Sequence, residues 1–257
     1  MNFIRKHWFP VALVLIISIL GIAYAAGVRV GPGLTLTLAE TLTVTGVPNG
    51  AEIVLDQNRV HVVKGDQAML RVAPGAHTVF VEIEGYEPWD ELFVMEKDKS
   101  VTLRPILVPS TSVKHALTEE EIATAQGAFA SYTLPTSEAP LSLAGGCIEV
   151  YTLENRVLAR ASTRLGCDVP QYLCEQESCS PTIVFSAPQS IRSVFALPGR
   201  EDALVVSARN SIYIAELDPR EPRLLTPLYR GTFPIALPFR EGFVLVTDAG
   251  DHFLLPL

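Results

Sequence analysis

Beyond residue 40 the sequence consists of short apolar segments separated by turn-forming residues, and this pattern limits the fold more than any other feature. Segments such as Ala51–Leu55 and His77–Ile83 alternate apolar and polar residues, which is the period of a strand with one buried face. Pro and Gly recur between these segments, as in Ala73-Pro74-Gly75. Turn signals spaced about 8–12 residues apart predict an antiparallel sandwich or barrel, so we expect a mainly β protein.

The N-terminal run Trp8–Val28 has no charged residue and follows Arg5 and Lys6. About 20 apolar residues cross the bilayer core as a helix, so the run predicts a transmembrane helix. Basic flanking residues stay in the cytoplasm. We therefore expect a single pass of the cytoplasmic membrane, with the N-terminus inside and the bulk of the chain extracytoplasmic. A secretory signal peptide cleaved after Ala25 is the alternative, and it exports the same residues.

The overall charge and apolar content exclude two classes of protein. Twenty basic residues against 28 acidic residues give a net charge of −8, whereas general nucleic-acid binding needs a basic surface. Apolar residues make up 48% of the chain, which is too many for a disordered protein. The partners that we expect are the membrane, reached through the N-terminal helix, and an envelope protein or glycan, but not nucleic acid.

The cysteines are clustered between positions 147 and 179. An even number of clustered cysteines in an oxidising compartment predicts two disulfides, and three connectivities are open. The spacing has no Cys-x-x-Cys pair of the kind that holds zinc, so we expect no metal here. The four residues are Cys147, Cys167, Cys174 and Cys179.

Three short motifs follow one another in the first β region. Pro48-Asn49-Gly50-Ala51 opens it, Pro74-Gly75-Ala76-His77 lies in its middle, and Glu84-Gly85-Tyr86 follows one strand later. In this order they resemble the PEGA domain, a small β module of bacterial and archaeal surface proteins, over residues 41–108. Asn49 stands where the opening motif of the family has Glu. The resemblance implies a small antiparallel β-sandwich.

The motif residues are of types that shape turns and pack strands. A proline presets φ and a glycine tolerates positive φ, so these pairs let the chain turn into the next strand. An alternative function is an exposed aromatic platform for sugars, formed by Tyr86 and Trp89. We assign structural roles to Pro48, Gly50, Ala51, Pro74, Gly75, Gly85 and Tyr86.

After the first β region we expect a linker and a second β domain. Thr118 and Glu121 have the spacing of a capping box, which predicts a short helix over about residues 119–127. The strand–turn–strand pattern around Pro198-Gly199 resembles the blades of a β-propeller. A blade needs about 40–45 residues and a closed ring needs at least four blades, so the C-terminal half is expected to be a blade-like sheet domain, an incomplete propeller or a sandwich.

The predicted organisation therefore has five parts. They are residues 1–28, a cytoplasmic leader and transmembrane anchor; 29–40, a stalk; 41–108, a PEGA-like β domain; 109–146, a linker with a short helix; and 147–257, a disulfide-bearing blade-like β domain.

The sequence contains no recognisable catalytic constellation. Neither the His-Glu-x-x-His pattern of zinc proteases nor the Gly-x-Ser-x-Gly elbow of hydrolases occurs, and we expect no cofactor. We therefore expect a non-catalytic, membrane-anchored envelope protein with a binding or scaffolding role. Two alternatives are an exported hydrolase with a dispersed active site, and a subunit of a larger surface assembly whose sheets another chain completes. The oligomeric state is not predicted.

Overall fold

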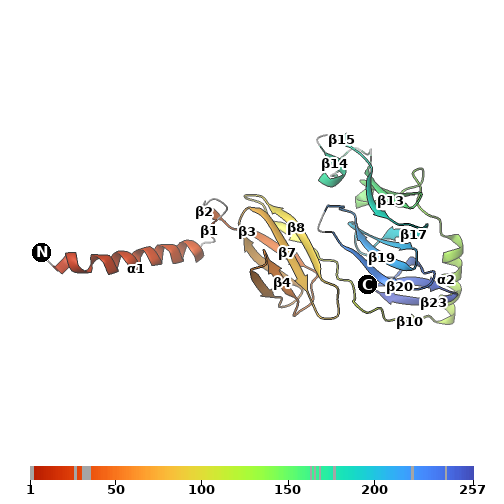
Figure 1. Ribbon diagram of the computed structural model, residues 1–257, viewed down its shortest axis with the longest axis horizontal. Coiled ribbons are helices and arrows are strands. Elements are labelled where there is room, and N and C mark those ends of the chain that lie inside the picture. The colour runs from red at the N-terminus through yellow and green to blue at the C-terminus, as the bar shows by residue number, and fades with distance from the viewer. Residues whose placement is uncertain are drawn as a thin grey trace. The chain divides into compact units, whose positions relative to one another are not determined.

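The structure is a computed structural model that describes residues 3–25, 28–30, 36–162, 164, 166–167, 169–175, 178–220, 223–240 and 242–257. It divides into two compact units (Figure 1). The first unit is Met1–Val81 with Leu92–Pro105, and the second is Glu82–Glu91 with Ile106–Leu257. Both consist mainly of strands, so the expected mainly β class is confirmed.

The N-terminal helix α1 has a helical backbone over Phe3–Ala25, and its side chains are described from Val11 to Ile22. Among the described residues, no helix is both long and apolar enough to cross a membrane. The transmembrane anchor therefore stays a prediction. After α1, the strands β1 (Val28–Val30) and β2 (Leu36–Leu38) pair antiparallel, whereas residues 31–35 of the expected stalk lie outside the described part.

The β region of the first unit forms two sheets. One has the order β6-β3-β9 and the other has the order β5-β4-β7-β8. The strands are β3 (Glu40–Thr45), β4 (Glu52–Leu55), β5 (Arg59–Val62), β6 (Gln67–Val72), β7 (Gly75–Glu82), β8 (Trp89–Met95) and β9 (Val101–Leu103). The last residue of β7, Glu82, and the first three residues of β8 belong to the second unit.

The expectation of a wholly antiparallel module is wrong for one pair of strands. β3 pairs antiparallel with β6, but it pairs parallel with β9, with Leu42 opposite Val101. The chain passes from β8 in one sheet to β9 in the other. A hairpin turn would force antiparallel pairing, but this connection crosses between sheets and leaves the strand direction free.

The core of the first unit follows from the period of two along its strands. Successive side chains of a strand point to opposite faces, and the inward ones are apolar. Leu42 and Val44 of β3 and Ile53 of β4 are fully buried, as are Val79 and Val81 of β7.

Over its described residues, the second unit contains three sheets of four strands, a two-stranded sheet and the helix α2. The sheet orders are β11-β12-β13-β16, β17-β18-β19-β20 and β21-β22-β23-β10. The strands are β10 (His115–Ala116), β11 (Leu141–Leu143), β12 (Ile148–Leu153), β13 (Arg156–Ala161), β16 (Thr182–Ser186), β17 (Ile191–Ala196), β18 (Ala203–Ala208), β19 (Ser211–Glu216), β20 (Leu225–Arg230), β21 (Ile235–Arg240), β22 (Phe243–Asp248) and β23 (Asp251–Pro256). The short pair β14 (Cys174–Glu175) and β15 (Ser178–Cys179) and the 3-10 turns η2 (Ala144–Gly146) and η3 (Gln171–Leu173) complete it.

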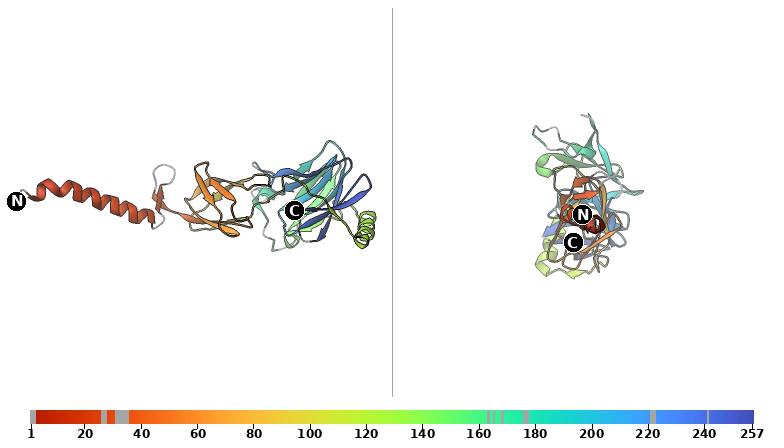
Figure 2. Two further views of the ribbon diagram at one scale, coloured as in Figure 1. Left: turned by 90° about the horizontal axis from the view of Figure 1, so that it is seen from below. Right: turned by 90° about the vertical axis from the view of Figure 1, so that its left-hand side faces the viewer.

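The helix α2 (Glu119–Ser131) begins at the predicted capping box. The Glu121 backbone nitrogen donates to Thr118 Oγ1 at 3.3 Å, and the Thr118 backbone nitrogen donates to Glu121 Oε2 at 2.9 Å. The helix runs four residues past Gly127, where we expected it to end, because Ala125 and Phe129 pack in one cluster with Leu245 and Leu254. Figures 1 and 2 show α2 beside β23.

The second unit is held together by apolar strands and by a buried pair of serines. Every residue of β18 is buried, as expected for a strand covered on both faces. Ser193 Oγ donates to Ser207 Oγ at 2.8 Å, and the Ala236 backbone nitrogen donates to Ser207 Oγ at 2.9 Å. The second bond links β21 to the sheet that contains β18.

Candidate binding pocket

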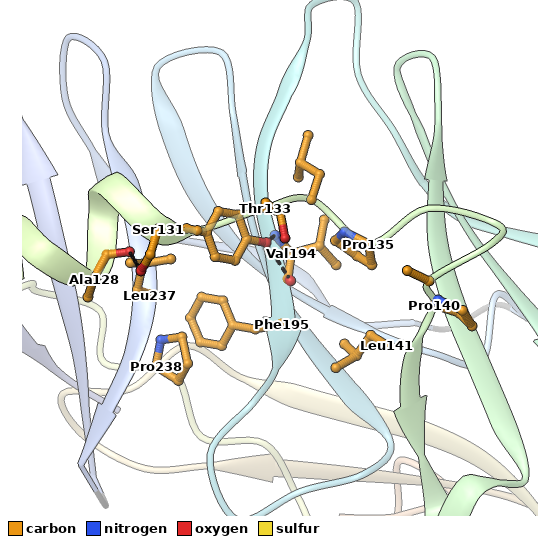
Figure 3. Close-up of a pocket in the computed structure, with 13 residues that line it drawn as sticks. Ala128, Ser131, Thr133, Pro135, Pro140, Leu141, Val194, Phe195, Leu237 and Pro238 are labelled. Carbon is orange, nitrogen blue, oxygen red and sulfur yellow. Dashed lines mark hydrogen bonds between the residues drawn. The ribbon is translucent and has the colours of Figure 1, made fainter.

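An apolar pocket of about 430 Å³ lies in the second unit between the end of α2 and the first strands of the three sheets (Figure 3). Its volume is within the range of small-molecule sites, about 300–1,000 Å³. The pocket is lined by Ala128, Ser131, Tyr132, Thr133, Leu134, Pro135, Ala139, Pro140, Leu141, Val194, Phe195, Leu237 and Pro238.

The Tyr132 hydroxyl covers one open sheet edge in this pocket. It donates to the Val194 carbonyl oxygen and accepts from the Val194 backbone nitrogen, both at 2.8 Å. β17 is the terminal strand of its sheet in the described part of the chain, so the Val194 groups that face away from β18 bond to this hydroxyl instead of to a paired strand. Burial raises the pKa of Tyr132, so the hydroxyl keeps its proton and continues to donate.

Pro238 limits hydrogen bonding on the facing wall. It lies in β21, another terminal strand, and proline has no backbone N–H to offer to an added strand. Phe195 and Leu237 are buried in the lining, and Figure 3 shows Phe195 near Pro238, with Pro140 and Leu141 on the other side. The pocket therefore suits an apolar group better than an added β-strand.

A second pocket, of about 760 Å³, adjoins the first and shares Leu141 and Pro238 with it. Its wall carries Arg200 and Arg240, and each arginine faces a carboxylate. Arg200 Nη2 lies 2.6 Å from Asp202 Oδ2, and Arg240 Nη1 lies 3.5 Å from Glu121 Oε1. We call the two pockets together the first-strand groove, because β11, β17 and β21 contribute to both.

The second unit also contains carboxyl groups whose pKa values are raised. Burial, followed by the negative charges of Glu216 and Asp218, raises the pKa of Glu91 to about 7. Burial also raises the pKa of Glu216, although the Leu224 backbone nitrogen donates to its carboxylate at 2.8 Å. At neutral pH, part of the Glu91 population is therefore protonated.

All four cysteines form disulfides, as expected. Cys147 is bonded to Cys167 and Cys174 to Cys179, with Cα–Cα distances of 5.2 and 4.0 Å. Of the three open connectivities, the chain adopts the one that joins neighbours in sequence. The second bond closes the hairpin of β14 and β15, where the two cysteines are directly paired.

The three motifs that resemble the PEGA domain lie in turns and at the starts of strands, and none of their residues lines the groove. Gly50, Gly75 and Gly85 have φ values of 92°, 141° and 87°, a region that glycine occupies without a steric penalty. The Ala51 backbone nitrogen donates to the Pro48 carbonyl oxygen at 3.2 Å, and Ala51 is fully buried. Pro74 immediately precedes β7.

The aromatic platform for sugars is wrong. Trp89 is only 2% exposed, and its Nε1 donates to Glu216 Oε1 at 3.0 Å within the second unit. Tyr86 is partly buried and forms an isolated bridge with Pro109. A sugar-binding platform needs an accessible ring face, which Trp89 does not have.

Sequence reasoning missed the residues that shape the groove. Pro238 within an alternating segment could have indicated an edge strand, since proline is confined to such positions in sheets. Tyr132 had no comparable signal. Its role depends on Val194, which is distant in sequence.

Comparisons with known proteins give a family match for the first β region. No curated protein matches the chain. A solved structure, the "AfRom2 CNH domain", is similar with 11% identity and a TM-score of 0.29, over 78% of this chain and 68% of that one. The family model of the PEGA domain matches residues 39–110. The resemblance expected from the three motifs is thus confirmed, and this part of the chain is similar to the PEGA domain family.

Proposed function

We propose that this chain is a membrane-anchored, extracytoplasmic envelope protein that binds or scaffolds another protein through the first-strand groove and has no catalytic role. The observation that carries the proposal is the apolar pocket of about 430 Å³. Tyr132 and Pro238 limit strand pairing in its walls, so the pocket is suited to apolar side chains of a partner.

Binding accounts for the lining better than catalysis does. Of the described residues that line the pocket, Tyr132 is the one with a titratable side chain. Its hydroxyl is engaged by both backbone groups of Val194. General acid–base chemistry needs a titratable group within reach of the substrate proton. The alternative of an exported hydrolase receives no support from this pocket.

The two disulfides support export, because such bonds persist in oxidising compartments. The apolar run Trp8–Val28 supports an anchor. Alkaline extraction of membranes tests the anchor: we expect the full chain to stay in the pellet. Release into the supernatant, with a new N-terminus after Ala25, would show a cleaved signal peptide instead.

The pocket can be tested with a small apolar probe. We expect indole, added to methyl-labelled full-length protein in non-ionic detergent, to shift the methyl signals of Leu141, Val194 and Leu237 in a saturable manner. Ala128→Trp fills the pocket and should abolish the shifts. Ala130→Trp is the matched control, because Ala130 is exposed on the same helix and does not line the pocket. Equal shifts in both variants would reject this site.

A further inference from the structure

The outward face of the four-stranded sheet in the first unit is apolar. Val62 is 49% exposed, Leu92 is 52% exposed and Val94 is 63% exposed. Val54 and Phe80 are partly buried. We call these five residues the outer patch, and all of them belong to the first unit.

The alternation of side chains places the outer patch on one face. In β8, Leu92 and Val94 flank the buried Phe93. In β4 and β7, Val54 and Phe80 each lie between two more deeply buried neighbours. β5 contributes Val62, which pairs across the strands with the exposed Glu52. The patch therefore extends over all four strands.

The other sheet of the same unit does not share this character. Its outward positions on β3 are Thr41, Thr43 and Thr45, which are partly buried, and an exposed Met69 lies opposite Thr43. An antiparallel sheet with one face in water normally has polar residues on that face. A contiguous apolar face is instead a feature of interaction surfaces.

The charges along these strands indicate the kind of partner. Among the described residues of the first unit, the ionisable side chain at an outward position of this sheet is Glu52 in β4, and it is an exposed acid. A second copy of the chain would bring like charges together, and an anionic lipid surface would also be repelled. A cationic protein segment would be attracted.

We propose that the outer patch docks an extended segment of another protein, in which apolar side chains alternate with lysine or arginine. The apolar side chains pack on Leu92, Val94 and Phe80, and a basic side chain reaches Glu52 at the start of β4. None of the five residues of the outer patch lines the first-strand groove.

The test uses a fluorescein-labelled synthetic peptide of sequence Lys-Val-Lys-Phe-Lys-Val-Lys and full-length protein in non-ionic detergent. Fluorescence anisotropy measures the affinity. We expect Leu92→Ser and Val94→Ser each to weaken binding roughly fivefold or more. Met69→Ser is the matched control, since Met69 is 68% exposed on the other sheet, and it should change the affinity less than twofold. All three positions are exposed, so the variants should remain folded.

Further measurements separate the patch from simple charge attraction. Glu52→Gln should weaken binding and reduce its salt dependence, and the peptide Glu-Val-Glu-Phe-Glu-Val-Glu should not bind. Equal affinity in wild type, Leu92→Ser and Val94→Ser would overturn the proposal. So would a concentration-dependent dimer in sedimentation that Leu92→Ser dissociates, because the occupant would then be a second copy.

Discussion

The carboxylate of Asp248 accepts a hydrogen bond from the Phe233 backbone nitrogen, with 2.7 Å between Oδ1 and that nitrogen. The Thr232 backbone nitrogen donates to the same carboxylate at 3.1 Å, and the Tyr229 hydroxyl donates to Oδ2 at 3.0 Å. One nearly buried side chain at the end of β22 thus fixes the connection between β20 and β21, and β21 is a wall of the first-strand groove.

We expect Asp248→Ala to lower the free energy of unfolding by about 3 kcal/mol, because three donors lose a charged acceptor. Burial raises the pKa of Asp248, but the hydrogen bonds from Phe233 and Thr232 outweigh burial and hold the pKa below its usual value. The stabilisation by the ionised Asp248 carboxylate should therefore be complete above about pH 4 and be lost as the pH falls further. Urea unfolding of wild type and variant at pH 7 and pH 3 measures both effects. An equal difference at the two pH values would contradict this account.

Gly231→Ala should disturb the same connection by steric clash. A Cβ atom on Gly231 would lie 2.7 Å from Tyr229 Cε1 and would overlap the Asp248 carboxylate. We expect a loss of about 2–3 kcal/mol. Gly127→Ala is the control: nothing lies within 4 Å of its added Cβ, and alanine stabilises a helix interior by about 0.5–1 kcal/mol. Thermal melts should move in opposite directions, and two similar shifts would refute the steric explanation.

Tyr132→Phe should leave the Val194 N–H and carbonyl groups without their partner. We expect a loss of about 1–2 kcal/mol, measured by chemical denaturation. The β17 edge at Val194 should also exchange its amide hydrogen faster with solvent than in wild type. Unchanged protection of the Val194 amide would mean that Tyr132 does not cover this edge.

The raised pKa of Glu91 should make stability fall as pH rises. Between about pH 4.5 and 7 the folded protein retains a proton that the unfolded chain has released, so folding is favoured at the acidic end of this window. Glu91→Gln cannot ionise and should be more stable than wild type at pH 8 by about 1–2 kcal/mol. This is less than the full equivalent of the shift, because water still reaches the side chain. Melting curves from pH 4 to 8 provide the test, and parallel curves for the two proteins would disprove it.

The two disulfides should contribute unequally. They span 20 and 5 residues of sequence, and the loop-entropy account gives about 3 kcal/mol for the longer loop and about 2 kcal/mol for the shorter. Replacing Cys147 and Cys167 by alanine should therefore lower the melting temperature more than replacing Cys174 and Cys179. Intact mass with and without reductant should differ by four hydrogens in wild type, and four free thiols before reduction would contradict both bonds.

The local features of the fold could be predicted from the sequence, because they depend on neighbouring residues. The capping box at Thr118 needs only a partner three residues away, and the turn at Gly50 needs only a residue that tolerates positive φ. The continuation of α2 past Gly127 could not be predicted, because it depends on Phe129 packing against the cluster of Leu245 and Leu254, a contact that no local pattern contains.

The shape of the groove and the burial of Trp89 depend on contacts between segments that are distant in sequence. Tyr132 meets Val194, and Trp89 meets Glu216, only after the chain has folded. The residues around Gly85 predict a turn, which the structure contains, but the burial of Trp89 could not be inferred from its neighbours in sequence. The cysteine pairing was open for the same reason.

The pairing of β10 with β23 has a consequence for how the second unit acquires its structure. His115 lies opposite Leu254 and Ala116 lies opposite Phe253, so a strand that precedes α2 completes the sheet that is made last during synthesis. This sheet cannot be finished until residues far apart in the chain have met, and such distant contacts form slowly. A chain synthesised from its N-terminus would hold β10 without its neighbour until β23 arrives, and during that interval it would be most exposed to proteases and to pairing with the wrong strand.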